Sequence, residues 1–226
     1  MKWLALLLLG AGCAAGCAQA QGLTLSPVML TAPAEGGPAA LTFTSGLAAP
    51  KMVQVRVFDW SQADGGEQMT PTENVKFGPE IFEIAPGKTQ TVRFLLPDTD
   101  GQGTWRVVVD ELPSATDASA GTTQLDLRLR YVLSMFAAPE GEPAMLQAAA
   151  EKDALTLTNP GHGWLKLHGL RLVTPDGRAD DANAGVVYLL PGATTRIPLE
   201  GGAAQYRTLS YNVGQNAYTL DLRPVP

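Results

Sequence analysis

The sequence has 226 residues, 45% of them hydrophobic and 17% charged, and a formal net charge of −6. Its 16 Lys and Arg are outnumbered by 22 Asp and Glu, so the chain lacks the excess of basic residues that a nucleic-acid surface needs. The length exceeds the about 100–150 residues of a typical domain, which predicts two domains.

The first twenty residues have the pattern of a secretion signal. Lys2 supplies a positive charge, residues 3–9 form an apolar run, and small residues lead to Ala-Gln-Ala at 18–20. This order predicts a signal peptide over residues 1–20, cleaved after Ala20. The apolar run is shorter than the ~20 residues of a membrane span, and no later run is longer, so no membrane insertion is expected after signal removal.

Both cysteines, Cys13 and Cys17, lie within this signal. Lipidation of Cys17 is an alternative that stays open, although residues 14–16 (Ala-Ala-Gly) lack the large apolar residue that such boxes usually carry. Without lipidation, the mature chain has no cysteine and therefore no disulfide, thiolate nucleophile or Cys-ligated metal. It would carry 15 basic and 22 acidic side chains, a net charge of −7.

Short runs rich in Val, Leu, Thr and aromatic residues recur along the chain, separated by Gly, Pro, Asn and Asp. They lie at residues 41–44, 52–60, 89–96, 105–112, 124–136, 154–158, 164–173, 194–199 and 217–222. Such spacing is typical of an all-β sandwich or barrel. The 24 Gly and 17 Pro provide the turns that this fold class requires.

A domain boundary is expected in residues 137–143, Ala-Ala-Pro-Glu-Gly-Glu-Pro, which follow the longest run. The predicted domains are residues 21–138 and 139–226, both of a size suited to immunoglobulin-like sandwiches. We expect residues 114–123, made of Ser, Thr, Ala, Gly and Asp, to form a hairpin loop.

Residues for catalysis are not found in any recognisable arrangement. The two histidines, His162 and His168, are not spaced like metal ligands, and no nucleophile elbow or Walker loop occurs. Asp110 and Glu111 are adjacent on a predicted strand and so point to opposite faces. The sequence therefore predicts a protein that is not an enzyme, with no catalytic residues, no metal and no cofactor.

The run 124–136 is the most informative. Alternate residues place six large apolar side chains on one face of the predicted strand: Leu125, Leu127, Leu129, Tyr131, Leu133 and Met135. Two interpretations are open. The core of the sandwich covers the whole row, or the strand is a sheet edge that offers the row to a partner by β-strand addition.

Several motifs taken together resemble the periplasmic pilus-assembly chaperones of the chaperone–usher pathway, the PapD-like family, over essentially residues 23–226. The motifs are Ser26-Pro27-Val28, residues 53–60, 79–87, 90–93 and 105–113, Leu129-Arg130-Tyr131, Phe136, Pro139 and Asn159-Pro160. The resemblance implies an all-β chain of two immunoglobulin-like β-sandwich domains in an L-shaped or boomerang arrangement.

The resemblance also implies a function in the periplasm. The last strand of the first domain, about residues 124–136, would complete a pilus or fimbrial subunit, and the chaperone would deliver the subunit to an outer-membrane usher. Carried over, the subunit-binding residues are Leu125, Leu127 and Leu129, with Tyr131 and Leu133 continuing the row. The alternative is a periplasmic immunoglobulin-like binding or scaffolding module that has no role in pilus assembly.

The sequence departs from the family at the site that anchors a subunit's terminal carboxylate. Family members place an arginine and a lysine there, but the matching positions here are Met29 and Ser134. In this respect the chain is similar to the archaic branch of the family. Arg106 is the first candidate for the missing anchor, and Arg93, Arg128 and Arg130 are the others.

Overall fold

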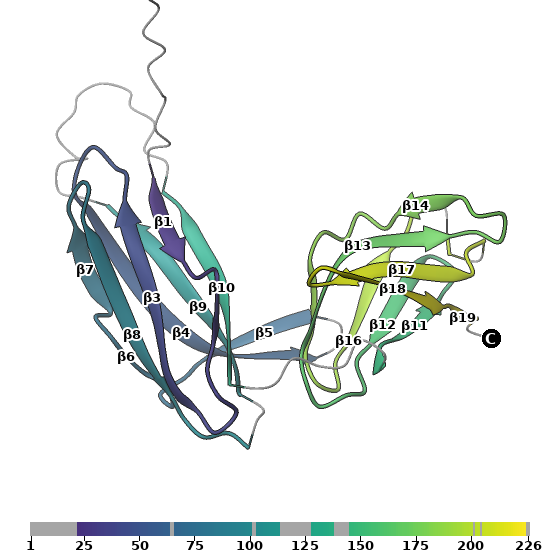
Figure 1. The fold of residues 1–226 in the computed structure, drawn as a ribbon, viewed down its shortest axis with the longest axis horizontal. Helices are drawn as coiled ribbons and strands as arrows, with labels where there is room; N and C mark the ends of the chain where they lie inside the picture. Colours follow the sequence, from purple (N-terminus) through teal and green to yellow (C-terminus); the bar gives the residue numbers. More distant parts are fainter. Residues whose placement is uncertain are drawn as a thin grey trace, which may run out of the picture.

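The chain forms two β-sandwiches set at an angle to each other, in an L-shaped arrangement (Figure 1). The structure is a computed structural model, and it describes residues 22–63, 66–100, 103–113, 128–137, 145–200, 202–203 and 205–224. Its regular elements are all β-strands, and none of the described residues forms a helix able to cross a membrane.

The first sandwich packs a four-stranded sheet against a six-stranded one. The four-stranded sheet has the order β1 (Leu23–Ser26), β3 (Gly37–Ser45), β8 (Thr89–Leu96), β6 (Lys76–Gly78). The six-stranded sheet has the order β2 (Met29–Thr31), β10 (Arg130–Ala137), β9 (Gly103–Leu112), β4 (Lys51–Ala63), β5 (Gly66–Pro71), and β7 (Ile81–Ile84) also pairs with β4. Thus β1 and β2, which are consecutive in sequence, belong to different sheets.

The strands change sheets beside two prolines. Pro27 lies between β1 and β2, and Pro79 lies between β6 and β7. Because proline has no N–H to donate to a ladder, each interrupts pairing at that point and the chain continues in the facing sheet. The first crossing is the one that matters for the site, since it brings β2 alongside β10 in parallel register.

The first core lies between the two sheets and follows the period-two alternation of their strands. Val53, Val55 and Val57 of β4 point into it, as do Val107 and Val109 of β9. Trp105 belongs to the same core. The alternate residues of β9 are also buried, including the charged Arg106 and Asp110, so both faces of this central strand are covered.

The second sandwich begins at β11 (Gln147–Ala150), so the alanines at 148–150 lie on a strand. One sheet has the order β16 (Thr194–Pro198), β12 (Ala154–Thr158), β11, β19 (Arg223–Pro224). The other has the order β14 (Ala179–Asp181), β13 (Leu165–Val173), β17 (Thr208–Val213), β18 (Asn216–Asp221), and β15 (Val187–Leu189) also pairs with β13. A separate core of leucines, with Tyr206 and Tyr211, fills the space between these sheets.

The predicted strands compare closely with the observed ones. Residues 89–96 and 154–158 have the predicted bounds as β8 and β12. The long run 124–136 is different, because its strand, β10, covers Arg130–Ala137, while residues 128–129 are not in a strand. The signal at 1–20, the hairpin loop at 114–123 and most of the boundary segment 137–143 lie outside the described residues.

Candidate functional site

Strand β10 has one edge that is only partly paired. Along its whole length it is bonded to β9 in antiparallel register, from Arg130 opposite Asp110 to Ala137 opposite Gly103. Its other edge is bonded to β2 only at residues 134–136. In the described part of the chain, residues 130–133 therefore present backbone groups along an edge that no strand covers, which is the requirement for β-strand addition.

The side chains of the apolar row differ in how far the fold buries them. Leu129 is 42% exposed, whereas Leu133 is 8% exposed and Met135 is fully buried. Tyr131 is half-buried and packs against the first core. Leu133, which was predicted to continue the subunit-binding row, packs in the core of the first sandwich, and its role in binding stays a prediction. Leu125 and Leu127 lie outside the described residues.

An ion-pair cluster fastens the start of β10 to β9. The Asp110 carboxylate accepts hydrogen bonds from Arg130 Nε at 2.5 Å and Arg56 Nη2 at 2.7 Å. Burial raises the pKa of the Asp110 carboxyl, but the hydrogen bonds and charges of Arg130 and Arg56 outweigh this effect, and the pKa lies below its ordinary value. The guanidinium of Arg130, one of the predicted anchors, is thus bound to a carboxylate of its own domain.

On the other face of β9, Glu111 lies beside Tyr131. Burial raises the pKa of the Tyr131 hydroxyl, and the charge of Glu111 and a hydrogen bond between the two side chains raise it further. The adjacent acids Asp110 and Glu111 therefore serve two different partners on opposite faces of the strand, as their spacing predicts.

Met29 and Ser134, which match the family's two anchor positions, lie in one row across the sheet with Arg106, the first candidate for the missing anchor. Met29 of β2 is in register with Ser134 of β10, and Ser134 is in register with Arg106 of β9. Arg106 is consequently one strand further along the same row. Arg130 is four residues from Ser134 and Arg128 six, about 13 and 20 Å along an extended strand, so neither lies in this row.

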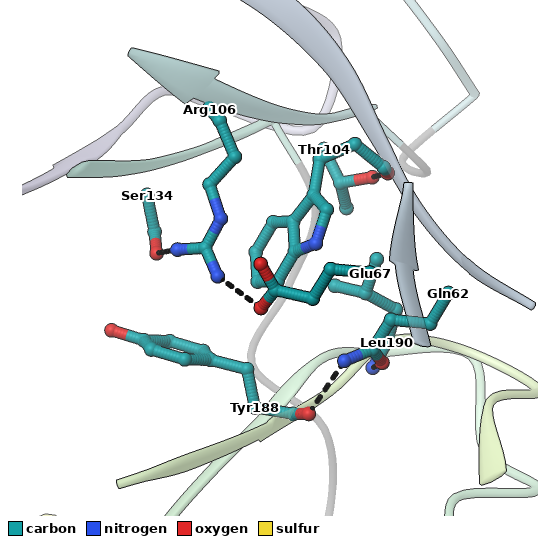
Figure 2. A network of polar contacts seen from close by, with 8 residues as sticks. Gln62, Glu67, Thr104, Arg106, Ser134, Tyr188 and Leu190 are labelled. Atoms are coloured by element: carbon teal, nitrogen blue, oxygen red, sulfur yellow. Dashed lines mark hydrogen bonds and ion pairs between the residues drawn. The ribbon is translucent and has the colours of Figure 1, made fainter. Parts of the chain in front are cut away.

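Arg106 is a buried cation at the junction of the two domains (Figure 2). Its side chain is 8% exposed. Its Nη1 donates to Ser134 Oγ at 2.6 Å and its Nη2 to Glu67 Oε1 at 2.5 Å. The guanidinium carbon lies 3.6 Å from the centroid of the Trp60 ring and 5.3 Å from that of Tyr188, a cation–π arrangement.

Two buried N–H groups of this site have no acceptor among the described residues. They are Arg106 Nε and Trp60 Nε1. A buried donor without an acceptor costs free energy, about 1–3 kcal/mol, and more when the group is charged. The site therefore has hydrogen-bonding capacity left for a further acceptor.

An aromatic cluster joins the two domains beside Arg106. Phe136 of β10 stacks on Trp164 of the second domain with ring centroids 4.3 Å apart, and Trp60 of β4 packs against Phe136 and Tyr188. Leu190 and Ala193 complete this buried group.

The end of β4 is also hydrogen-bonded to the second domain. The Gln62 side-chain amide donates to the Tyr188 carbonyl at 2.8 Å and accepts from the Leu190 N–H at 2.8 Å. The Gln62 amide thus donates one hydrogen bond and accepts one, as a backbone peptide group does when two strands pair. A cavity of about 600 Å³ lies beside them, and its lining includes Gln62, Glu67 and Tyr188.

Glu67 and Gln62 were not identified from the sequence. Glu67 is 39 residues from Arg106 along the chain, and their contact depends on how far the β4–β5 hairpin extends beyond the sheet. The predicted run at residues 52–60 ends before Gln62, whereas the observed strand covers Lys51–Ala63. As for metals, the described segments contain no group of three or more His, Cys, Asp or Glu able to hold an ion.

Comparison with known proteins identifies the first domain. Residues 22–143 match the family of pili and flagellar-assembly chaperones, PapD N-terminal domain. The chain belongs to this chaperone family. A comparison with curated proteins found no match.

Solved structures with the same two-domain fold cover nearly the whole chaperone. A chain of the CsuC–CsuE chaperone–tip adhesion subunit complex, from archaic Csu pili of Acinetobacter baumannii, has a TM-score of 0.69 at 18% identity and covers 91% of this chain and 100% of its own. A chain of the Salmonella enterica SafA pilin–SafB chaperone complex has a TM-score of 0.66 at 16% identity, with 90% and 98% covered. The Escherichia coli chaperone DraB has a TM-score of 0.64 at 16% identity, with 90% and 97% covered.

Proposed function

We propose that this chaperone acts in the periplasm, where it binds pilus or fimbrial subunits by donating the strand at about residues 124–136 and delivers them to an outer-membrane usher. The partners are supported by family membership and by the similar structures, two of which are complexes of a chaperone with a pilus subunit. The periplasmic location is supported by the predicted signal at residues 1–20.

The observation that carries the proposal is the uncovered edge of β10 at residues 130–133, which continues from the exposed Leu129. A subunit that lacks a strand exposes an apolar groove and unpaired backbone groups. An added strand satisfies those backbone groups, and each leucine buried in the groove contributes about 1.5–3 kcal/mol. Leu125, Leu127 and Leu129 are the residues we assign to the groove.

Arg106 is the residue to which we assign the subunit's terminal carboxylate. It is a buried cation in the same row as Ser134 and Met29, it lies at the domain junction, and its Nε has no acceptor within the described chain. A carboxylate bound to a guanidinium in a site of this kind forms charge-assisted hydrogen bonds, which are about twice as strong as neutral ones.

Co-purification tests the proposal. Affinity-tagged chaperone and a pilus subunit encoded beside its gene would be expressed together, and the complex would be isolated from a periplasmic extract. We expect a complex of one chaperone with one subunit, and a subunit that is degraded or aggregated when expressed alone. A subunit that accumulates in a soluble, folded form without the chaperone, and does not bind it, would overturn the proposal.

A further inference from the structure

The anchor cation of the free chaperone already carries a carboxylate from its own chain. Glu67 of β5 bonds to Arg106 Nη2, and the two residues lie 39 apart in sequence (Figure 2). Glu67 itself does not need this ion pair, because its side chain is 47% exposed and water can hydrate the carboxylate. The pairing acts instead on Arg106, whose nearly buried charge would otherwise have, among the residues that the structure describes, only the Ser134 hydroxyl as a hydrogen-bond acceptor.

The pairing uses only part of the guanidinium. Nε and Nη2 lie on the same edge of the group, and a carboxylate placed side-on to that edge bonds to both. Glu67 bonds to Nη2 with one oxygen, and Nε has no acceptor among the residues described. A carboxylate that approaches without the constraint of the hairpin can make both bonds, and it therefore binds the same cation more strongly than Glu67 does.

The strand that carries Glu67 is free to release it at low cost. All six residues of β5 are exposed, and β5 is the edge strand of its sheet, bonded only to β4. Glu67 also lines the cavity of about 600 Å³ between the hairpin and the second domain. A released Glu67 carboxylate would thus move into solvent, where its hydration replaces the lost ion pair.

We propose that Glu67 is a displaceable internal ligand, which occupies Arg106 in the free chaperone and is exchanged for the terminal carboxylate of an arriving subunit. This inference rests on the proposed function, since it takes Arg106 as the anchor. Glu67 keeps the buried cation paired between subunits. The residue thereby contributes to the stability of the empty site.

The expected size of the effect follows from competition. A partly exposed ion pair of this kind contributes up to about 1 kcal/mol of stabilisation. At that value Glu67 is dissociated from Arg106 in about one sixth of the molecules. The apparent affinity for an external carboxylate is reduced by the same fraction. Removing the charge of Glu67 should therefore tighten binding of a carboxylate up to about 6-fold and leave binding of an uncharged terminus unchanged.

The test uses the mature full-length chaperone and a synthetic hexapeptide of alternating valine and threonine, prepared with a free C-terminal carboxylate or with an amide. Binding would be measured by calorimetry for the wild type, Glu67→Gln and Glu83→Gln. Glu83 is exposed on β7 of the same sheet, so its variant has the same change of charge without the contact to Arg106. We expect Glu67→Gln to bind the carboxylate peptide up to about 6-fold more tightly, and Glu83→Gln to match the wild type.

Equal or weaker binding of the carboxylate peptide by Glu67→Gln would overturn the inference and make Glu67 a residue that positions Arg106. Arg106→Ala separates this outcome from a failure of the proposed function. If Arg106→Ala loses the preference for the carboxylate peptide but Glu67→Gln gains nothing, only the exchange is wrong. If no variant, nor the wild type, distinguishes the carboxylate from the amide, the anchor itself is wrong.

Discussion

Gln62 and Glu67 lie directly opposite each other on the antiparallel strands β4 and β5. The Gln62 side chain bonds to the backbone of the second domain, while the Glu67 side chain bonds to Arg106 of the first. One cross-strand pair therefore connects the anchor cation to the domain junction (Figure 2). Because the β4–β5 hairpin makes both contacts, we expect the arrangement of the domains and the pairing of Arg106 with Glu67 to depend on each other.

Replacing Gln62 with alanine tests that dependence. Gln62→Ala removes the two hydrogen bonds to Tyr188 and Leu190, while the aromatic cluster of Trp60, Phe136 and Trp164 remains. Each neutral hydrogen bond contributes about 0.5–1.5 kcal/mol, so we expect a small loss of stability and a wider distribution of interdomain angles. Small-angle X-ray scattering would measure the distribution. A scattering curve identical to that of the wild type would show that the aromatic cluster alone fixes the domains.

A charge on the exposed part of the donor strand should block subunit capture without unfolding the chaperone. Leu129→Glu places a carboxylate where a subunit groove would take an alkyl chain, and a buried unpaired charge costs far more than the leucine contributes. Since Leu129 is 42% exposed in the free protein, its melting temperature should change by no more than a few degrees. Leu127→Glu is expected to behave in the same way. Pull-down of a co-expressed subunit, with circular dichroism melting of the free variants, measures both effects.

Truncation of Leu133 should do the opposite. Leu133→Ala removes a side chain that packs in the first core, and such substitutions cost about 2–5 kcal/mol of unfolding free energy. Urea denaturation followed by tryptophan fluorescence would measure the loss, and Val132→Ala, on the exposed face of the same strand, is the control. If Leu133→Ala is as stable as Val132→Ala, the division of the apolar row into presented and buried residues is wrong.

Arg106 is expected to be required for subunit capture. Arg106→Ala removes the cation that would pair with the subunit's carboxylate, and the loss of one partner of such a pair costs ~2–5 kcal/mol, about 30-fold or more in affinity. The half-exposed Glu67 would be hydrated after the change, so the variant should remain folded. Binding to a co-expressed subunit would be compared with that of Arg93→Ala.

Arg93 is a suitable control because it is an exposed arginine on β8, in the other sheet of the same sandwich. It was itself a candidate for the anchor, so the comparison also decides between the two. Wild-type capture by Arg106→Ala together with a loss in Arg93→Ala would reverse the assignment. Arg106→Lys, which keeps the charge but not the planar group, should have an intermediate affinity.

The Asp110 cluster should make stability depend on pH in acid. The pKa of Asp110 is lowered in the folded chain, so the unfolded chain binds more protons as pH falls, and the stabilisation present above the ordinary pKa is lost on acidification through the folded pKa. Asp110→Asn should be less stable than the wild type at pH 7, by about 1–2 kcal/mol, and the difference should shrink below about pH 4. Denaturant titrations at pH 7, 5 and 3 would measure it. A constant difference at all three pH values would contradict the assignment.

Much of the architecture could be predicted from the sequence because it follows from local patterns. The alternation of apolar residues and the spacing of glycines and prolines predicted strands such as β8 and β12 with their observed bounds. The row Leu125 to Met135 was also visible as an alternation. The alternation could not show which members are covered, since exposed and buried residues of one face have the same period.

The sequence by itself determined the all-β class, the alternating apolar row from Leu125 to Met135, and the presence of Met29 and Ser134 where family members have basic residues. The tertiary structure decided which side chains lie beside these two positions. Ser134, Arg106 and Glu67 are brought together by the pairing of β10 with β9 and by the reach of the β4–β5 hairpin, over separations of 28 and 39 residues. Contacts over such distances depend on strand order and register, which the periodicity of any single strand does not contain.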